Sequence, residues 1–458
     1  AFELIDENPS TPTANTVTGA NAVGIGNNVT VSGSNAFGIG NGTTSSGLYS
    51  FAGGLSTTAS GDYAFAFGNS NTVAGDSSIG IHGDTASGAS DSVAIGNGST
   101  TANSGAIAIG NSRAAGTNGF AAAIGNNTSS YGTTGSNSVA IGRLALSSGT
   151  QAVAINQATA SGNYSFATIP TATASGSYTV AIGYGATASS LTATAIGANS
   201  AGSGAQASGS GAVALGGSNA AGADSFAAAI DNNTSTYGAT TTNTIAIGNQ
   251  AKANASNAVA IGNTARASQT SAIAMGKDAL VTGLYSVALG GSGSEASATY
   301  ATAINGYSPI ADTMGKVVFG TAYVDWTRAP QTGIMTLFAD TTDATATEVL
   351  AQNTSLVLPN NSAYSFTGTI IAREDATDGS DYAAWEVKGA LLRDANAAST
   401  VLGNGIVNKL YATSGASAWD IALSADTTNG RLKIEATGAA STNIRWVATL
   451  HSAEVTYA

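Results

Sequence analysis

The chain of 458 residues has no cysteine, only two histidines and few charged residues, which make up 9% of its length. Disulfide bonds therefore contribute nothing to its stability, and its redox compartment is undetermined. No apolar stretch reaches the roughly 20 residues that a membrane-spanning helix needs. The net charge is −12, so the chain lacks the basic surface that binds nucleic-acid phosphates, and nucleic acid is not an expected partner.

The chain is also poor in side chains that carry catalysis. Without cysteine, and with only His82 and His451, it offers no cluster with the spacing of a metal site. We interpret both histidines as structural or solvated. The acidic residues of the repetitive part are sparse and out of register, so they do not form the close pair that hydrolyses glycosidic bonds. We therefore expect no cofactor, no metal and no enzymatic activity.

The sequence contains instead a cassette, Val-Ala-Ile-Gly, that recurs at a spacing of 14 residues. A fixed period of this kind is typical of solenoid proteins. The glycine of each cassette is expected to lie at a corner of the chain, because glycine adopts positive φ at little cost. The predicted structural corners are Gly26, Gly40, Gly54, Gly68, Gly96, Gly110, Gly183, Gly197, Gly248, Gly262, Gly276 and Gly290.

A second glycine follows many of these anchors seven residues later, as Gly33 follows Gly26, so each repeat has two corners. Between the corners lie short alternating runs in which Val93 and Ile95 point to one face and Ala94 to the other. Two short strands per turn, joined by glycine corners, predict an all-β fold, a parallel β-roll (β-solenoid) of 14-residue coils. A coiled coil is excluded, because the positions that would need large apolar residues hold glycine.

Each coil offers only two or three large aliphatic side chains. Burying one stabilises the fold by roughly 1.5–3 kcal/mol, whereas ordering the backbone costs about 1–2 kcal/mol per residue. A lone roll is therefore marginal. The alanine-rich face is expected to pack against copies of itself, and a parallel homotrimer would supply the missing burial. Twofold packing also satisfies this argument.

The composition changes after residue 314, because all four tryptophans and most of the lysines and arginines follow it. Alternating runs such as 364–372, 384–392 and 431–437 predict a C-terminal β-sandwich or jelly roll. The expected domains are an N-terminal connector (1–19), the β-roll (20–306), a linker (307–314) and a C-terminal β-sandwich knob (315–458).

Receptor recognition is expected in the knob, because loops on a rigid scaffold commonly carry it. An aromatic ring suits the apolar side of a sugar, and among the tryptophans Trp385 and Trp446 are interpreted as core residues. An acidic loop at 374–381 is interpreted as a solvated turn, with Ca²⁺ binding as the alternative. The candidate receptor-binding residues are Trp326, Trp419, Arg373, Asp378 and Asp381.

The cassette Ser-Val-Ala-Ile-Gly, followed by a small polar run with Ala-Ser-Gly, resembles the head repeats of YadA-like trimeric autotransporter adhesins over residues 20–305. This resemblance implies left-handed parallel β-rolls that assemble as trimers and bind surfaces. Segments 339–346, 358–362, 384–385, 423–430 and 443–449 resemble a C-terminal domain of phage tail-fibre and other virion proteins, over residues 315–458. The second resemblance implies a virion fibre that ends in a trimeric knob.

The favoured function is therefore a structural fibre protein of a phage virion. As a parallel homotrimer it would attach the particle to a host cell-surface glycan or protein, and its N-terminus would contact other virion proteins. The expected localisation is the extracellular virion. A trimeric adhesin or matrix filament on the bacterial cell surface is the alternative, and a polysaccharide depolymerase is less favoured.

Overall fold

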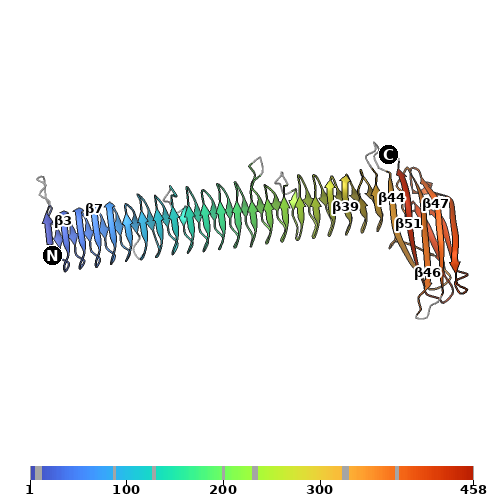
Figure 1. Ribbon diagram of the computed structural model, residues 1–458, viewed down its shortest axis with the longest axis horizontal. Coiled ribbons are helices and arrows are strands. Elements are labelled where there is room, and N and C mark those ends of the chain that lie inside the picture. The colour runs from blue at the N-terminus through green and yellow to red at the C-terminus, as the bar shows by residue number, and fades with distance from the viewer. Residues whose placement is uncertain are drawn as a thin grey trace. The chain divides into compact units, whose positions relative to one another are not determined.

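The computed structural model describes residues 2–5, 13–85, 89–125, 130–198, 202–229, 236–321, 330–376 and 381–456. The chain divides into two compact units, residues 1–224 and 225–458. Both units contain coils of a parallel β-roll, about 20 turns in all, and the second unit also contains an antiparallel C-terminal domain (Figure 1). This confirms the predicted all-β fold class.

In the first unit each coil contributes one strand to each of two parallel sheets. The first sheet contains β1 (Phe2–Ile5), β3 (Val23–Asn27), β5 (Phe37–Asn41), β7 (Phe51–Leu55), β9 (Phe65–Asn69), β11 (Ile79–Ile81), β13 (Val93–Ile95), β15 (Ile107–Ile109), β17 (Phe120–Ala122), β19 (Val139–Ile141), β21 (Val153–Ile155), β23 (Phe166–Thr168), β25 (Val180–Ile182), β27 (Thr194–Ile196) and β29 (Val213–Leu215). The second sheet contains β2 (Thr16–Val17), β4 (Thr30–Val31), β6 (Thr44–Ser45), β8 (Thr58–Ala59), β10 (Thr72–Val73), β12 (Asp84–Thr85), β14 (Thr100–Thr101), β16 (Arg113–Ala114), β18 (Gly132–Thr133), β20 (Leu146–Ser147), β22 (Thr159–Ala160), β24 (Thr173–Ala174), β26 (Thr187–Ala188), β28 (Gln206–Ala207) and β30 (Asn219–Ala220).

The roll of the second unit has the same construction. Its first sheet contains β31 (Phe226–Ala228), β33 (Ile245–Ile247), β35 (Val259–Ile261), β37 (Ile273–Lys277), β39 (Val287–Ser292), β41 (Thr302–Ile304) and β43 (Val317–Gly320). Its second sheet contains β32 (Gly238–Ala239), β34 (Lys252–Ala253), β36 (Arg266–Ala267), β38 (Leu280–Val281), β40 (Glu295–Ala296) and β42 (Ile310–Ala311).

Successive strands pair in register, so that like residues stack on like. Ala94 of β13 faces Ala108 of β15, and Ile95 faces Ile109. Pairing of this kind begins within residues 1–19, where β1 pairs with β3 and β2 with β4. It continues into residues 307–314, where β42 pairs in parallel with β40. Coil-like strands therefore occupy parts of both segments that the sequence suggested as connector and linker.

The core of the roll consists of the small residues rather than the large ones. Ala94 is completely buried between Val93, which is half-buried, and Ile95, which is 36% exposed. The second sheet repeats this arrangement, since Ala114 and Ala160 are also completely buried. The expectation that the alanine-rich face would point outward is therefore wrong. The two sheets approach so closely that the space between them is filled mainly by alanine, serine, threonine and a few valines, and most of the larger aliphatic residues lie on the outside; Ile124 is a buried exception.

The two glycine series satisfy different requirements of this narrow coil. All twelve anchor glycines have positive φ, and Gly26, with a φ of 131°, illustrates a second constraint because a Cβ there would lie 1.9 Å from the carbonyl oxygen of Gly40 on the next coil. Gly33 does not have positive φ, but a Cβ at that position would lie 2.0 Å from the carbonyl oxygen of Gly47. The second series is thus glycine because consecutive coils touch there, and not because of its backbone conformation.

The C-terminal domain contains two antiparallel sheets. Its elements are β44 (Gln331–Thr341), β45 (Thr347–Glu348), β46 (Ser362–Glu374), β47 (Tyr382–Arg393), the 3₁₀ turn η1 (Ala397–Ser399), β48 (Val401–Ala412), β49 (Asp420–Asp426), β50 (Arg431–Thr437) and β51 (Ile444–Thr456). The larger sheet has the order β44-β51-β46-β47-β48, and the smaller has the order β45-β50-β49. Side chains from both sheets form one core around Trp385 and Trp446, whose ring centroids lie 5.4 Å apart.

A buried polar network joins the last coil to this domain within the second unit. β43 pairs in parallel with β41 on one side and antiparallel with β44 on the other. Lys316, just before β43, is completely buried, and its Nζ lies 2.7 Å from Glu454 Oε1 on β51. Gln331 Nε2 donates to Glu454 Oε2 at 2.7 Å and to the Ile310 carbonyl at 3.0 Å. The network fixes the junction because each of its buried polar groups has a partner.

Candidate binding surfaces

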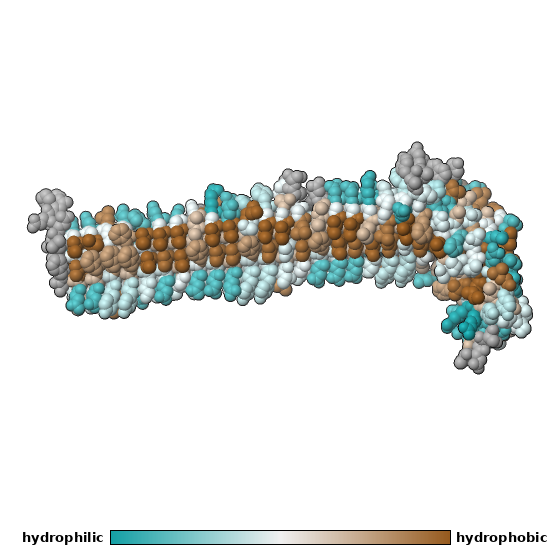
Figure 2. Space-filling view, in the orientation of Figure 1, coloured by the Kyte–Doolittle hydropathy of each residue, from teal (hydrophilic) through white to brown (hydrophobic). Residues whose placement is uncertain are grey.

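The outward face of the first sheet exposes large apolar side chains on coil after coil. Figure 2 shows them as a brown band over the roll strands of each unit, bordered by polar residues. In the described strands of this sheet, the two outward positions beside the buried central residue hold no charged side chain. We call this face the aliphatic stripe after its predominant isoleucines. Its exposed members include Ile39, Phe65, Phe67, Ile79, Ile95, Ile109, Ile141, Ile196, Ile245, Met275 and Phe319.

The outward face of the second sheet has the opposite character. Most of its outward positions hold polar or charged residues such as Gln206 and Arg266, and Leu146, Leu280 and Ile310 are half-buried exceptions. Contiguous apolar surface of the kind found in the aliphatic stripe is rare on monomeric proteins and marks an interaction site. The two faces together indicate that one side of the roll is made for contact with another apolar surface and the other side for water.

Three pairs of tyrosines project from the turn that precedes the first-sheet strands. Tyr49 stacks on Tyr63 at 5.3 Å between ring centroids, Tyr164 on Tyr178 at 4.8 Å, and Tyr285 on Tyr300 at 5.4 Å. All six lie two residues before a strand, are about half exposed, and have φ between 54° and 58°. We call them the tyrosine pairs.

The tyrosine pairs occupy a backbone conformation that suits aromatic residues poorly. The left-handed conformation costs roughly 1–2 kcal/mol for a residue with a Cβ, and tyrosine, unlike asparagine, is not one of the residues that tolerate it. A stacked aromatic pair contributes about 0.5–1.5 kcal/mol beyond the stabilisation from the area that its rings bury. On other coils the same turn position holds asparagine, and Asn21 Nδ2 donates to Asn35 Oδ1 at 3.2 Å. Asparagine thus satisfies the turn at a lower cost than tyrosine.

The candidate residues of the knob are only partly brought together. Trp326 and Asp378 lie outside the described residues. Trp419 is 1% exposed and packs 6.0 Å from Trp446, so it presents no ring face at the surface. Trp419 lies immediately before β49, two residues from Ile421. Alternating residues of a strand share one face, and both side chains belong to the core.

Arg373 and Asp381 lie at the same end of the larger sheet. Arg373 is exposed at the end of β46 and faces Tyr382, the residue after Asp381. Asp381 is half-buried and accepts a hydrogen bond from Thr413 Oγ1 at 2.6 Å. The exposed Tyr382 stacks on Tyr411 at 5.2 Å, and a hydrogen bond with Tyr411 raises the pKa of Tyr382. Within the described part of the chain, no three potential metal ligands come together.

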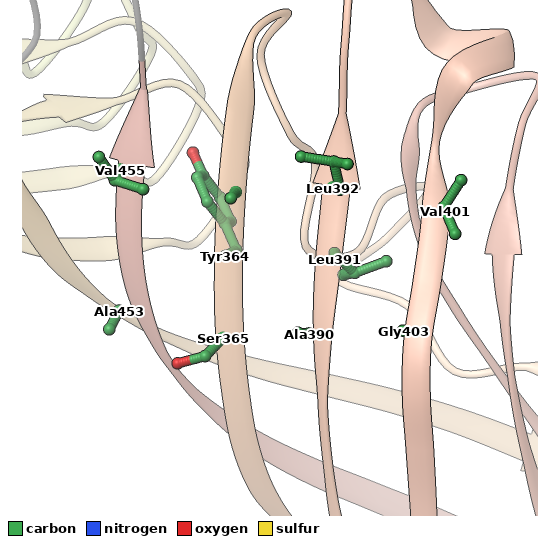
Figure 3. Close-up of a pocket in the computed structure, with 10 residues that line it drawn as sticks. Tyr364, Ser365, Ala390, Leu391, Leu392, Val401, Gly403, Ala453 and Val455 are labelled. Atoms are coloured by element: carbon green, nitrogen blue, oxygen red, sulfur yellow. The ribbon is translucent and has the colours of Figure 1, made fainter.

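Sequence reasoning missed the apolar outer face of this sheet. Phe338, Val447, Ile371 and Tyr411 are each at least 41% exposed, and the strand register carries them in one row across β44, β51, β46, β47 and β48. Nearer the other end of these strands, Val455, Leu392 and Val401 line a shallow groove with a volume of about 520 Å³ (Figure 3).

The sequence did not predict strand β48, because Gly403 and Gly405 interrupt its alternation. Ile406 and Leu410 were a usable signal for this strand.

Comparison with known proteins supports the reading of the roll. The family model described as the YadA head domain repeat matches residues 59–79, 87–112, 134–155, 174–200, 239–265 and 267–292. These segments lie in the coils described above, so the resemblance to YadA head repeats is confirmed for the roll. A search of curated proteins gives no match. Among the described residues, no helix is both long and apolar enough to cross a membrane.

Two solved structures of phage tailspikes show weak similarity. One is tailspike protein gp49 from Acinetobacter baumannii bacteriophage Fri1, a capsular polysaccharide depolymerase, with 9% identity over 97% of this chain and 72% of that chain and a TM-score of 0.19. The other is the tailspike protein of Acinetobacter phage vB_ApiP_P1, with 10% identity over 98% and 79% of the two chains and a TM-score of 0.16. At these scores neither similarity carries an argument about function.

Proposed function

We propose that the chain is a structural fibre protein of a phage virion that forms a parallel homotrimer and attaches the particle to a host surface. The observation that carries this proposal is the uncharged aliphatic stripe on a roll whose own core is alanine. A surface of this kind needs an apolar partner, and a second and third copy of the same roll provide one. The resemblance to trimeric YadA heads favours three copies over two.

The outer face of the larger knob sheet extends the same surface. β43 belongs to the roll and also pairs with β44, so the outward side of the roll sheet runs into the outward side of the knob sheet within the second unit. Exposed apolar residues occur on both, including Phe319 on β43 and Phe338 on β44. We infer that copies of the chain contact one another through both parts, with the knob as a trimeric end of the fibre.

The oligomeric state tests this proposal directly. We expect mass photometry of the full chain to give the mass of three copies. Ile196→Asp places a charge in the aliphatic stripe and should yield monomers, whereas Gln206→Asp, on the exposed strand β28 of the second sheet, should leave the trimer intact. A monomeric wild-type chain at micromolar concentration would contradict the proposal.

Attachment and location need separate experiments. Antibody labelling of particles should place the chain on the virion, with the N-terminus joined to other virion proteins, and free fibre should compete with particles for host cells. We place recognition in the knob, near Arg373 and Asp381, because loops on a rigid scaffold commonly carry recognition. Labelling of bacterial cell surfaces instead of particles would favour the alternative adhesin or matrix filament, which the YadA-like repeats also support. Release of reducing sugars from host polysaccharide would favour the depolymerase alternative.

A further inference from the structure

The tyrosine pairs are left unexplained by the trimer and by the fold. They lie in the turn beside the first sheet and not in the aliphatic stripe, so a contact through that stripe does not require them. Replacement by asparagine, which occupies the same turn on other coils, would relieve an unfavourable backbone conformation. The turn itself does not require an aromatic residue, because asparagine, serine, glutamine or threonine occupies the same position on other coils.

Each ring of a pair turns one flat face toward its partner and the other flat face away from it. Within a pair the rings are nearly parallel, with angles between ring planes of 15°, 1° and 9°. Each ring therefore covers the inner face of its neighbour, while its outer face looks along the roll toward the next coil. The corresponding turn residues on the flanking coils are small or flexible: Asn35 and Ser77 for the first pair, Gln151 and Thr192 for the second, and Ser271 and Gly315 for the third.

The third pair shows the open face most clearly. Gly315 follows Tyr300 at the same turn position on the next coil, and it carries no side chain. A Cβ built at Gly315 would meet no atom within 4 Å. Among the described residues, the outer face of the Tyr300 ring, which is 51% exposed, therefore has no side chain stacked on it from the Gly315 position of the next coil.

Polar groups beside the rings suit hydroxyl-bearing ligands. Next to the first pair, one carboxylate oxygen of Asp62 accepts from the Leu48 amide at 2.8 Å, and one of Asp76 accepts from the Asp62 amide at 2.9 Å. The second oxygen of each carboxylate can accept a hydrogen bond from a ligand hydroxyl. The roll has few cations and the chain a net charge of −12, which disfavours an anionic ligand.

We propose that the three tyrosine pairs of the roll are stacking sites for an uncharged glycan, which the outer ring faces hold by their contact with the apolar side of a sugar ring. This inference rests on the proposed attachment function and deepens it by adding a second, roll-borne site to the one in the knob. The first two pairs lie eight first-sheet strands apart, from β7 to β23, which is about 38 Å at 4.8 Å per strand. A long polysaccharide can therefore engage both pairs of the first unit, and its affinity gains from multivalency.

The test uses the full chain and a microbial polysaccharide array as the probe. We expect the wild-type fibre to bind at least one uncharged polysaccharide. Tyr285→Asn with Tyr300→Asn should weaken that binding about tenfold, and replacing all six tyrosines by asparagine should weaken it at least 100-fold. Tyr184→Asn is the matched control, because Tyr184 is 56% exposed but lies outside the pairs, and it should bind as the wild type does.

Two further measurements separate this inference from the proposed function. The six-tyrosine variant should remain folded and trimeric. Unchanged glycan binding by that trimeric variant would overturn the inference and leave the fibre proposal standing, as would an array on which the wild type binds no uncharged polysaccharide. Loss of the trimer in that variant would overturn it by making the tyrosines interface residues. A wild-type monomer would instead contradict the fibre proposal.

Discussion

Glycine at position 26 meets two separate physical requirements. It has positive φ, and its Cα hydrogen occupies a place where a Cβ would lie 1.9 Å from the Gly40 carbonyl oxygen. Gly216 also has positive φ, at 64°, but a Cβ there would meet nothing within 4 Å. The two positions therefore separate the cost of backbone conformation from the cost of coil contact.

We predict that Gly216→Ala lowers the free energy of unfolding by about 1–2 kcal/mol, which is the cost of the left-handed conformation. Gly26→Ala should lower it by roughly 1–3 kcal/mol more, because the coils must move apart. Gly26→Val should be more severe, since a β-branched residue at positive φ is a strong outlier. Denaturant unfolding of the variants measures the difference. Equal losses for the two alanine variants would show that coil contact at Gly26 is unimportant.

The Asp426 carboxylate makes part of the knob's stability depend on pH. Partial burial raises the pKa of Asp426, but hydrogen bonds from Asn429, Arg431 and Thr428 outweigh this effect and hold the pKa well below its usual range. Of these donors, the Arg431 guanidinium donates from Nε to Asp426 Oδ2 at 2.8 Å. An acid whose pKa is depressed in the folded state stabilises the fold above its unfolded-state pKa.

We predict that this contribution is complete above about pH 4, the ordinary range of an aspartate, and is lost as the pH falls toward the folded pKa. Asp426→Asn should reduce stability at pH 7 and flatten the acid limb of the stability curve. Denaturant unfolding of both proteins at a series of pH values measures this. A stability difference between them that stays constant from pH 7 to pH 2 would contradict the assignment.

At the scale of elements, the junction between β43 and β51 depends on one buried ion pair. Removal of one partner leaves the other charge buried and unpaired, which costs about 3–5 kcal/mol. We predict a loss of this size for Lys316→Met, and recovery of most of it in the double variant Lys316→Met with Glu454→Met. The control is Lys388→Met, which breaks the exposed pair with Glu386 and should cost less than about 1 kcal/mol. Thermal unfolding that ranks the two single variants in the reverse order would contradict this role.

How much of each element could be predicted depended on what the pattern encodes. The period and the glycine corners were enough to predict a parallel roll, and alternation correctly grouped Val93 with Ile95 against Ala94. Alternation does not say which group is inside, and hydrophobicity alone favours the larger residues. The deciding quantity is the distance between the two sheets, which is visible only in three dimensions.

The site was less predictable than the fold for similar reasons. The sequence allows Trp419 to be either an exposed sugar-binding residue or a core residue. Only its packing against Trp446 shows that it belongs to the core. The two tyrosines of each pair lie one coil apart in the sequence, so their stacking depends on the register between neighbouring coils. Tyr285 and Tyr300 are 15 residues apart rather than 14, which conceals their equivalence in a strict periodic count.

At the scale of the whole molecule, the composition of the aliphatic stripe predicts how the assembly responds to salt. Interactions between exposed charges are screened within about 8–10 Å near physiological ionic strength, whereas an apolar contact is not weakened by added salt. We therefore predict that the trimer keeps its mass between low salt and about 1 M NaCl. Analytical ultracentrifugation across this range measures it. Dissociation in high salt would mean that charged residues, and not the stripe, hold the copies together.

The antiparallel pairing of β44 with β43 also has a consequence for length. A parallel roll that ended in an unpaired strand would offer a template on which another chain could continue the ladder. Because β44 occupies that edge in the opposite direction, further parallel coils cannot be added there. The number of coils then equals the number of repeats in the sequence. Each inserted repeat lengthens the ladder by about 4.8 Å. Evolution can thus adjust the reach of the chain one repeat at a time without rebuilding the terminal domain.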